Sequence, residues 1–112
     1  MKVLILDDEK SRHDGFNKIY QGEEIHHAYH VGEAIELMNK HQFDIAQLDF
    51  DLGSGCPTGL DAVEAIIAMD DWQRPRTVIV HSRGDEEPRE MGRRLLQYVD
   101  KVRRSPYLAP KE

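Results

Sequence analysis

The 112-residue sequence contains a single cysteine and no apolar run approaching the roughly 20 residues that a helix needs to cross a bilayer. One cysteine cannot form a disulfide within the chain, and such low cysteine use fits a reducing compartment. The N-terminal apolar segment ends at Asp7, which makes it too short and too soon acidic for a signal peptide. We therefore expect a cytoplasmic protein without a membrane-spanning segment.

Basic residues are too few to balance the acidic ones: 15 Lys and Arg face 21 Asp and Glu, giving a formal net charge of −6. Non-specific nucleic-acid binding needs a net basic surface that displaces counterions, so this balance argues against it. Hydrophobic residues make up 39% of the chain, which excludes a disordered protein, and the length fits one domain. We expect that domain over residues 1–107, followed by an irregular tail at 108–112.

Hydrophobic periodicity alternates along the chain between the patterns of buried strands and amphipathic helices. A continuous apolar run predicts a strand at residues 3–6, and further strands are predicted at 24–29, 43–48 and 77–80. Between them, apolar residues recur at helical spacing, as Val31, Ala34 and Met38 do, and a capping-box pattern at 11–14 predicts a helix start. A later helix is predicted from the stripe of Met91, Leu95, Tyr98 and Val99. Residues 101–104 fit either a fifth strand or the frayed end of a helix. This alternation predicts an α/β fold, a doubly wound parallel sheet of four to five strands.

Chemically reactive side chains follow three of the predicted strands. Asp7 and Asp8 come after the first strand, Asp49 and Asp51 after the third, and Ser82 after the fourth. In a doubly wound sheet, ligands bind beyond the carboxyl ends of the strands. Carboxylates crowded at that edge repel one another unless a divalent cation neutralises them, and oxygen ligands of this kind suit Mg²⁺. A carboxylate outside the metal's ligand set can attack phosphorus.

The same residues carry a resemblance to a known family. The L-I-L-D-D-E motif at residues 4–9, then Asp49 and Ser82, occur in the order found in receiver domains of response regulators, and the likeness covers about residues 1–107. The resemblance implies a flavodoxin-like receiver fold and a phosphorelay role. It also implies that the first acidic pair binds Mg²⁺ (or Mn²⁺), that Asp49 accepts a phosphoryl group from a phosphodonor protein, and that Ser82 responds to it.

The C-terminal part departs from the receiver pattern. Receivers carry a Lys-Pro pair at the end of the fifth strand, whereas this sequence reads Arg103-Arg104-Ser105-Pro106. The resemblance therefore puts Arg104 in the place of the lysine, which keeps the charge and changes its geometry. Few residues follow Pro106, so we expect a shortened C-terminus without a full fifth helix.

Three further motifs are similar to a narrower group, the cyclic-phosphate-processing receiver domains. These motifs are L-D-x-D-L-G at residues 48–53, T-G at 58–59 and H-S at 81–82. The Asn that often follows the H-S pair in that group is replaced here by Arg83-Gly84-Asp85. The resemblance adds Asp51 and His81 as site candidates. Asp51 could coordinate the metal or leave that role to a backbone carbonyl, and His81 could act as a general acid or base near neutral pH. Because neighbouring side chains on a strand alternate, His81 could equally point away from Ser82.

These observations favour a stand-alone atypical receiver domain that performs Mg²⁺-dependent phosphoryl chemistry on a phosphate-bearing small molecule. The enzymatic form of this hypothesis is hydrolysis of a cyclic phosphate or phosphoester. Asp49 would be either a metal ligand or the attacking carboxylate, and Ser82, His81 and Arg104 would lie at the reacting group. One alternative is a signalling receiver phosphorylated on Asp49 that binds a partner protein. Another is a binding protein that keeps the receiver fold without catalysis.

A histidine cluster at His26, His27 and His30 raises the question of a zinc site. His26 and His27 should point to opposite faces of a strand, which disfavours shared ligation of one metal ion. We therefore expect His26, His27 and His30 to lie on a solvated strand end. His13 and His41 are isolated in the sequence and need no functional explanation.

Overall fold

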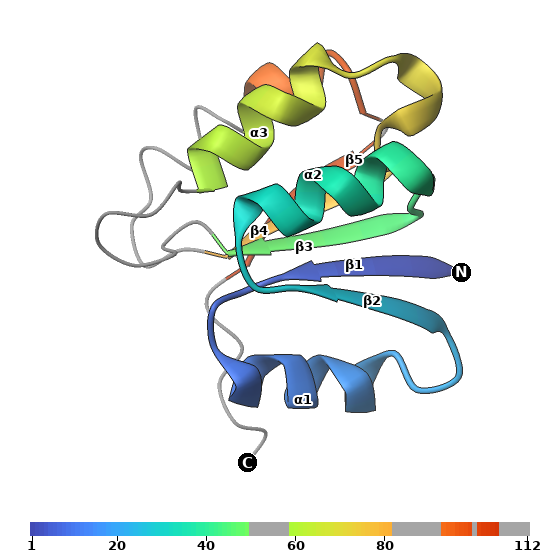
Figure 1. The fold of residues 1–112 in the computed structure, drawn as a ribbon. Coiled ribbons are helices and arrows are strands. Elements are labelled where there is room, and N and C mark those ends of the chain that lie inside the picture. Colours follow the sequence, from blue (N-terminus) through green and yellow to red (C-terminus); the bar gives the residue numbers. More distant parts are fainter. Residues whose placement is uncertain (50–58, 82–92, 100, 106–112) are drawn as a thin grey trace.

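The computed structural model describes residues 1–49, 59–81, 93–99 and 101–105, which form a five-stranded parallel sheet with the strand order β2-β1-β3-β4-β5 (Figure 1). The strands are β1 (Lys2–Leu6), β2 (Glu24–Ala28), β3 (Ile45–Asp49), β4 (Thr77–His81) and β5 (Lys101–Ser105). The predicted doubly wound α/β sheet is confirmed, and the open choice at residues 101–104 is decided in favour of a strand. The predicted tail at 108–112 lies outside the described residues.

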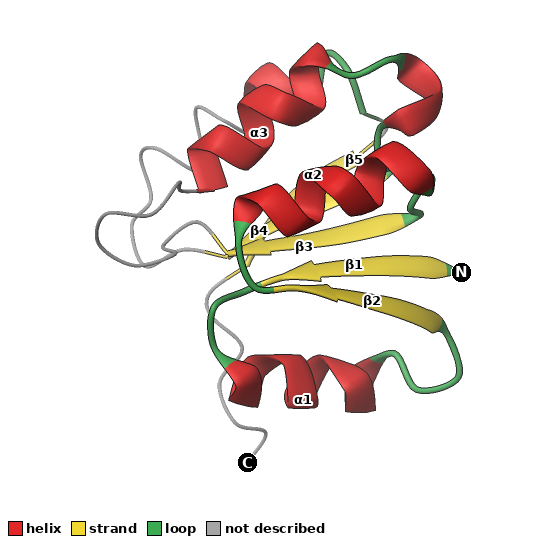
Figure 2. Cartoon of the chain, viewed as in Figure 1, coloured by secondary structure: helices red, strands yellow, loops and turns green. Residues whose placement is uncertain are grey.

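Helices cover both faces of the sheet (Figure 2). Helix α1 (Lys10–Ile19) lies on one face, whereas α2 (Val31–Lys40) and α3 (Gly59–Ala68) lie together on the other, and a 3₁₀ turn, η1 (Asp71–Gln73), precedes β4. Placing α1 and α2 on opposite faces is what a doubly wound sheet requires. No helix within the described ranges is long and apolar enough to cross a membrane.

Strand β1 is the centre of the core because its side chains are buried on both faces. Leu4 and Leu6 belong to the larger hydrophobic cluster, formed with α2 and α3, and Val3 and Ile5 pack with Phe16 of α1. These four of the five β1 residues are at most 1% exposed. The continuous apolar run in the sequence therefore marks a strand buried on both faces, as predicted.

The register of the sheet brings the ends of the strands to one edge. Leu6 pairs with Leu48, and Asp49 pairs with His81, so β1, β3 and β4 end level with one another. Side chains alternate along a strand. Asp49 therefore follows Gln47 on the face that carries α1, and this alternation places chemistry-bearing residues at the carboxyl edge of that face.

Two details of the sequence prediction are wrong. Helix α1 begins at Lys10, with Glu9 as an N-cap that makes no side-chain cap hydrogen bond, so residues 11–14 do not form the predicted capping box. Tyr98, assigned to a core stripe with Leu95 and Val99, is 42% exposed, although those two residues are buried. The Tyr98 ring lies under the guanidinium of Arg74 at 4.8 Å from its centroid, a cation–π contact that holds it at the surface.

The burial pattern predicts a large difference between two identical substitutions. Ile66 in α3 is fully buried, whereas Ile19 at the end of α1 is 51% exposed. Ile66→Ala should lower the free energy of unfolding by about 2–5 kcal/mol, because it removes buried methylene groups and leaves a cavity. Ile19→Ala should change it by well under half as much. Urea unfolding of both variants measures the difference, and equal midpoints would contradict the packing described here.

Candidate functional site

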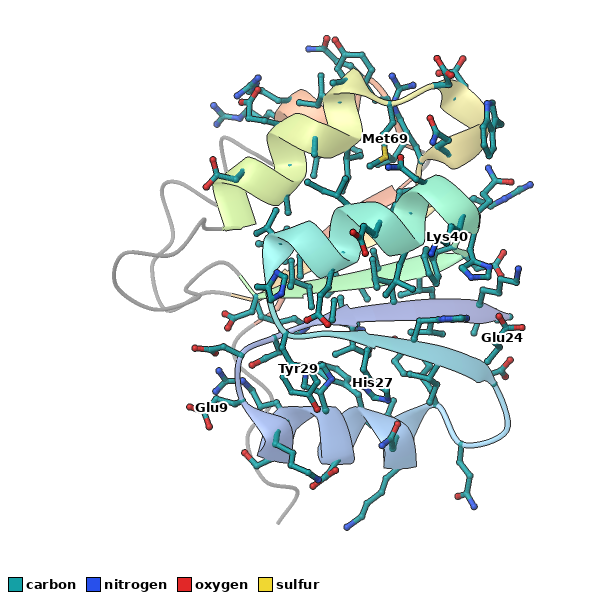
Figure 3. The ribbon with its side chains drawn as sticks, in the orientation of Figure 1. Glu9, Glu24, His27, Tyr29, Lys40 and Met69 are labelled. Carbon is teal, nitrogen blue, oxygen red and sulfur yellow. The ribbon has the colours of Figure 1, made fainter. Side chains whose placement is uncertain are left out.

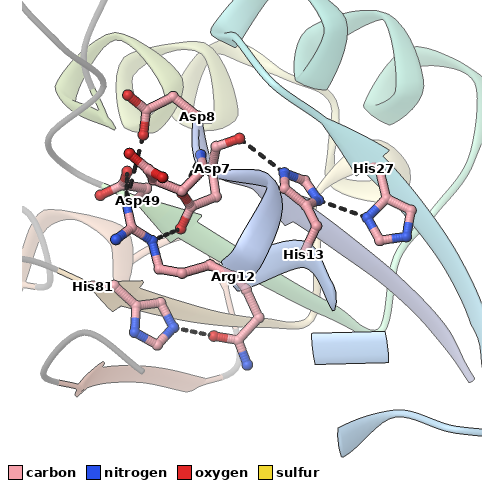
Figure 4. A network of polar contacts seen from close by, with 9 residues as sticks. Asp7, Asp8, Arg12, His13, His27, Asp49 and His81 are labelled. Atoms are coloured by element: carbon pink, nitrogen blue, oxygen red, sulfur yellow. Dashed lines mark hydrogen bonds and ion pairs between the residues drawn. The ribbon is translucent and has the colours of Figure 1, made fainter. Parts of the chain in front are cut away.

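Three carboxylates converge at the carboxyl edge of the sheet, and we call Asp7, Asp8 and Asp49 the acidic cluster. Asp7 and Asp8 directly follow β1, and Asp49 is the last residue of β3 (Figure 4). One carboxylate oxygen from each lies within 4.8 Å of the others. The side chains of Asp7 and Asp49 are 3% and 0% exposed, whereas Asp8 is 37% exposed. The cluster is therefore open to solvent through Asp8.

The guanidinium of Arg12, on the first turn of α1, contacts all three carboxylates of the acidic cluster. Its Nε donates to Asp7 Oδ2 at 2.6 Å, and its Nη2 lies 3.5 Å from both Asp8 Oδ1 and Asp49 Oδ2. The other oxygen of Asp7, Oδ1, accepts a hydrogen bond from the backbone N–H of Glu9 at 2.9 Å. Sequence reasoning missed Arg12 because it was assigned to a helix cap. Its spacing of four residues from Asp8 was the signal that could have found it.

The chemistry of the acidic cluster fits a hard divalent cation. All three side chains offer carboxylate oxygens, the ligand type that Mg²⁺ and Mn²⁺ prefer. Together with Arg12, the three carboxylates carry a formal charge of −2, which a divalent cation would balance. The acidic edge predicted from the sequence is therefore present as a converged site.

His81 is held in a chain of polar contacts that runs away from the acidic cluster. Its Nε2 donates to Gln47 Oε1, and Gln47 Nε2 donates to the hydroxyl of Tyr20 at 2.6 Å. The His81 ring packs edge-on against Phe16, with centroids 5.5 Å apart. His81 is 5% exposed and is the register partner of Asp49, so it lies beside the cluster with Nε2 already committed to Gln47.

A second histidine, His13 of α1, ties the acidic cluster to β2. His13 is 2% exposed, and its Nε2 donates to the backbone carbonyl of Asp7 at 2.8 Å. A carbonyl only accepts, so in a neutral His13 ring Nδ1 is the acceptor in the 2.6 Å contact with Nδ1 of His27. The opposite side of His13 is stacked on the ring of Tyr29, at a centroid distance of 4.1 Å. Sequence reasoning treated His13 as isolated, because the pairing depends on how α1 packs on β2.

The remaining predicted site residues are not tested by these contacts. Asp51 and Ser82 lie outside the described residues. Arg104 belongs to β5, where its backbone is in register with Val80, and its side chain is likewise outside the description. Their roles stay predictions.

Comparison with known proteins decides the family. A family model described as a cyclic-phosphate processing receiver domain matches residues 2–97. The chain belongs to this family. No curated protein matches the sequence. The predicted resemblance to the cyclic-phosphate-processing group is thus confirmed.

Solved structures of receiver domains share the fold. Chemotaxis protein CheY4 of Vibrio cholerae superposes with a TM-score of 0.73 at 22% identity, over 96% of this chain and 88% of that one. A response regulator receiver protein from Methanoculleus marisnigri JR1 gives 0.71 at 21% identity, over 94% and 84%. A CheY-like receiver domain from Methanospirillum hungatei JF-1 gives 0.70 at 22%, over 96% and 83%. At such identities the likeness shows the receiver fold, which the sequence predicted.

The contacts of Arg12 predict a cation-dependent stability defect. Arg12→Gln should lower the free energy of unfolding by about 1–3 kcal/mol in chelator, because the carboxylates of the acidic cluster lose a partly buried counter-charge. Saturating Mg²⁺ should recover most of this loss. Thermal unfolding with and without Mg²⁺ measures both effects.

The matched control for that experiment is Lys10→Gln on the same helix. Lys10 pairs only with the exposed Asp14 among the contacts described for it, and the two side chains are 78% and 57% exposed. An exposed pair of this kind contributes little to stability. A Lys10→Gln variant as unstable and as Mg²⁺-responsive as Arg12→Gln would contradict the role given to the guanidinium.

The contact between His13 and His27 predicts a pH dependence. Burial, followed by the neighbouring His13, lowers the pKa of His27 below its ordinary value of 6.5. The unfolded chain then binds more protons than the folded one, so the free energy of unfolding should fall as pH drops below about 6.5 and level off below the folded pKa. His27→Asn should remove this part of the slope. Urea midpoints between about pH 7.5 and 5 test it, and parallel curves for the two proteins would refute it.

Proposed function

We propose that this receiver domain performs divalent-cation-dependent phosphoryl chemistry at the acidic cluster, acting on a small molecule that carries a cyclic phosphate. The observation that carries the proposal is the convergence of Asp7, Asp8 and Asp49 within 4.8 Å at the carboxyl edge of the sheet. Membership of a family described as processing cyclic phosphates supports the substrate class. Ligands of doubly wound sheets bind at this edge.

The roles of the three carboxylates follow from their exposure. Asp7 and Asp49, both buried, are suited to hold a cation in a fixed position, and the more exposed Asp8 faces the side from which cation and substrate approach. Mg²⁺ bound there would supply positive charge to a phosphoryl oxygen. Asp51, two residues beyond Asp49, is the further ligand that the sequence suggests.

Arg12 is suited to hold the phosphoryl group. Its guanidinium already lies between three anionic groups and is 22% exposed, so a substrate oxygen can replace one of its present partners. Guanidinium groups bind phosphate oxygens in a bidentate manner. In this proposal Arg12 exchanges a contact with the acidic cluster for one with the substrate, and Ser82 and Arg104 complete the anion-binding set.

The proposed reaction is hydrolysis of one ester bond of the ring. The oxygen of a water molecule forms a bond to phosphorus, one of the two ring P–O bonds breaks, and the leaving oxygen takes up a proton. The product is a phosphomonoester. His81, whose Nε2 donates to Gln47, is the candidate general acid or base that moves this proton.

A signalling role is the second candidate, and the likeness to response regulator receivers favours it. In that reading Asp49 attacks a phosphodonor and the acyl-phosphate changes the surface for a partner protein. The side chain of Asp49 is 0% exposed, so direct attack requires the neighbouring side chains to move. Binding a cation requires less movement of the side chains around Asp49, which is why we prefer the hydrolytic role.

Binding of Mg²⁺ should raise the stability of the fold. At a Mg²⁺ concentration 100-fold above its Kd, the wild type should gain about 2.7 kcal/mol by linkage. Asp8→Asn should gain much less, because it removes a ligand and part of the charge repulsion. Asp14→Asn, an exposed acid on α1, is the matched control and should behave as the wild type. Equal responses of the wild type and Asp8→Asn would argue against a cation at the acidic cluster.

Turnover separates the candidate functions. Incubation with a 2′,3′-cyclic nucleotide and Mg²⁺, followed by phosphorus NMR, should show a phosphomonoester that accumulates beyond one equivalent, and Asp49→Asn should abolish it. A stable mass increase of one phosphoryl group from an acyl-phosphate donor, without turnover, would favour the signalling role. A protein that responds to neither reagent and not to Mg²⁺ would fit a binding protein without catalysis.

A further inference from the structure

A second group of potential ligands lies at the opposite end of the sheet, where the strands begin. Glu24 opens β2 near the N-terminus of the chain, remote from Glu9 at the carboxyl edge (Figure 3). Glu24, His26 and His41 each offer one ligand atom, and the three atoms lie within 4.8 Å of one another. We propose that these three residues, here called the histidine site, bind a transition-metal ion of the Zn²⁺ type.

Strand geometry explains why two of the ligands come together. Residues two apart on a strand point to the same face, so Glu24 and His26 are neighbours on the face of β2 that carries α2. Their side chains are in contact, with His26 Nε2 2.7 Å from Glu24 Oε2. The third member, His41, directly follows the last residue of α2, and its ring centroid lies 4.5 Å from that of His26.

The same geometry explains why the sequence did not reveal the site. His27, the next residue of β2, points to the other face and contacts His13 and Asn17, as the predicted alternation requires. The adjacent histidines in the sequence therefore do not share a ligand. The second imidazole comes from His41, fifteen positions after His26, and only the packing of α2 on β2 brings it there.

A buried aromatic ring packs against both imidazoles of the histidine site. Phe43 is 0% exposed and contacts both imidazoles, with its ring 5.4 Å from His26 and 5.9 Å from His41 between centroids. An apolar floor of this kind restricts ring orientation and limits solvent access on one side of a metal site. The two imidazoles are only partly buried and Glu24 is exposed, so the outer side stays accessible to an ion and to water.

The donor set distinguishes the histidine site from the acidic cluster. Two imidazoles and one carboxylate are a set used for Zn²⁺, with water in the fourth position. Mg²⁺ prefers oxygen ligands throughout and would select the acidic cluster. The two ends of the sheet therefore offer different ligands. Zn²⁺ should prefer the histidine site, and Mg²⁺ should prefer the acidic cluster.

A cationic group already lies against two members of the histidine site. Lys2 Nζ is 3.3 Å from Nδ1 of His41 and 4.0 Å from Glu24 Oε2. An ammonium group can only donate, so His41 accepts through the lone pair of a neutral ring, the form that binds metal. Positive charge is therefore accommodated here, and an incoming metal ion would displace the ammonium of Lys2.

Calorimetric titration with Zn²⁺ tests the proposal on untagged protein. Excess Mg²⁺ should occupy the acidic cluster, and a Cys56→Ser background removes the chain's one thiol as a competing ligand. The wild-type histidine site should bind one Zn²⁺. His26→Asn and His41→Asn should each weaken binding at least about tenfold, since even loss of an outer partner of a ligand costs that much. Unchanged affinity in both variants would overturn the site.

His27→Asn is the matched control, because it removes the neighbouring imidazole of the same strand on the opposite face. It should bind Zn²⁺ as the wild type does, and a loss equal to that of His26→Asn would overturn the assignment. Far-UV circular dichroism establishes that each variant is folded before titration.

Lys2→Met should bind Zn²⁺ several-fold more tightly, since the competing ammonium is gone. Equal or weaker binding would contradict the displacement of Lys2.

A spectroscopic measurement gives an independent readout. Co²⁺ in place of Zn²⁺ should produce the visible absorption of a four-coordinate site in the wild type and in His27→Asn, and not in His26→Asn or His41→Asn. Absorption that persists in both of these last variants would place the ion elsewhere and refute the proposal. Because the histidine site shares no residue with the acidic cluster, this result does not depend on the proposed phosphoryl chemistry.

Discussion

Repulsion among the carboxylates of Asp7, Asp8 and Asp49 is the constraint on which the rest of the site depends. Two unit charges 4.8 Å apart interact with roughly 3 kcal/mol at an effective dielectric constant of about 20, and the cluster contains three such pairs. The fold accommodates this through the guanidinium of Arg12 and the backbone N–H of Glu9. No buried side-chain nitrogen or oxygen among the described residues lacks a hydrogen-bond partner. The acidic edge is therefore an arrangement in which each carboxylate has a partner and a net negative charge remains.

The sequence was informative where the backbone alone decides the outcome. Apolar runs that end in acid predicted β1 and β3, and parallel strands that end level must bring Asp7 and Asp49 together, whatever their side-chain rotamers. The sequence was uninformative where a side chain chooses among several partners. Periodicity could not show that Arg12 turns toward the strand ends, nor that Nε2 of His81 donates to Gln47. His41 illustrates the same limit, since its neighbours belong to a different element.

Family membership and site geometry contribute different kinds of knowledge. The family match and the superpositions establish a receiver domain. At about 22% identity the superpositions show the fold and do not assign roles to single residues. The chemistry has to be argued from side chains. At one end of the sheet these are carboxylates with a guanidinium, and at the other they are imidazoles with a glutamate. Alternation along β2 separates His26 from His27 and thereby gives each face of the strand a separate histidine network.

The stack of His13 on Tyr29 connects the acidic edge to the surface of the protein. The carbonyl of Asp7 is bonded to His13, whose ring lies 4.1 Å from that of Tyr29, a residue 41% exposed on the opposite side. A shift of the Asp7 backbone would change the distance or tilt between those two rings. A movement of the backbone at the acidic edge therefore reaches the surface of the protein through two stacked aromatic rings.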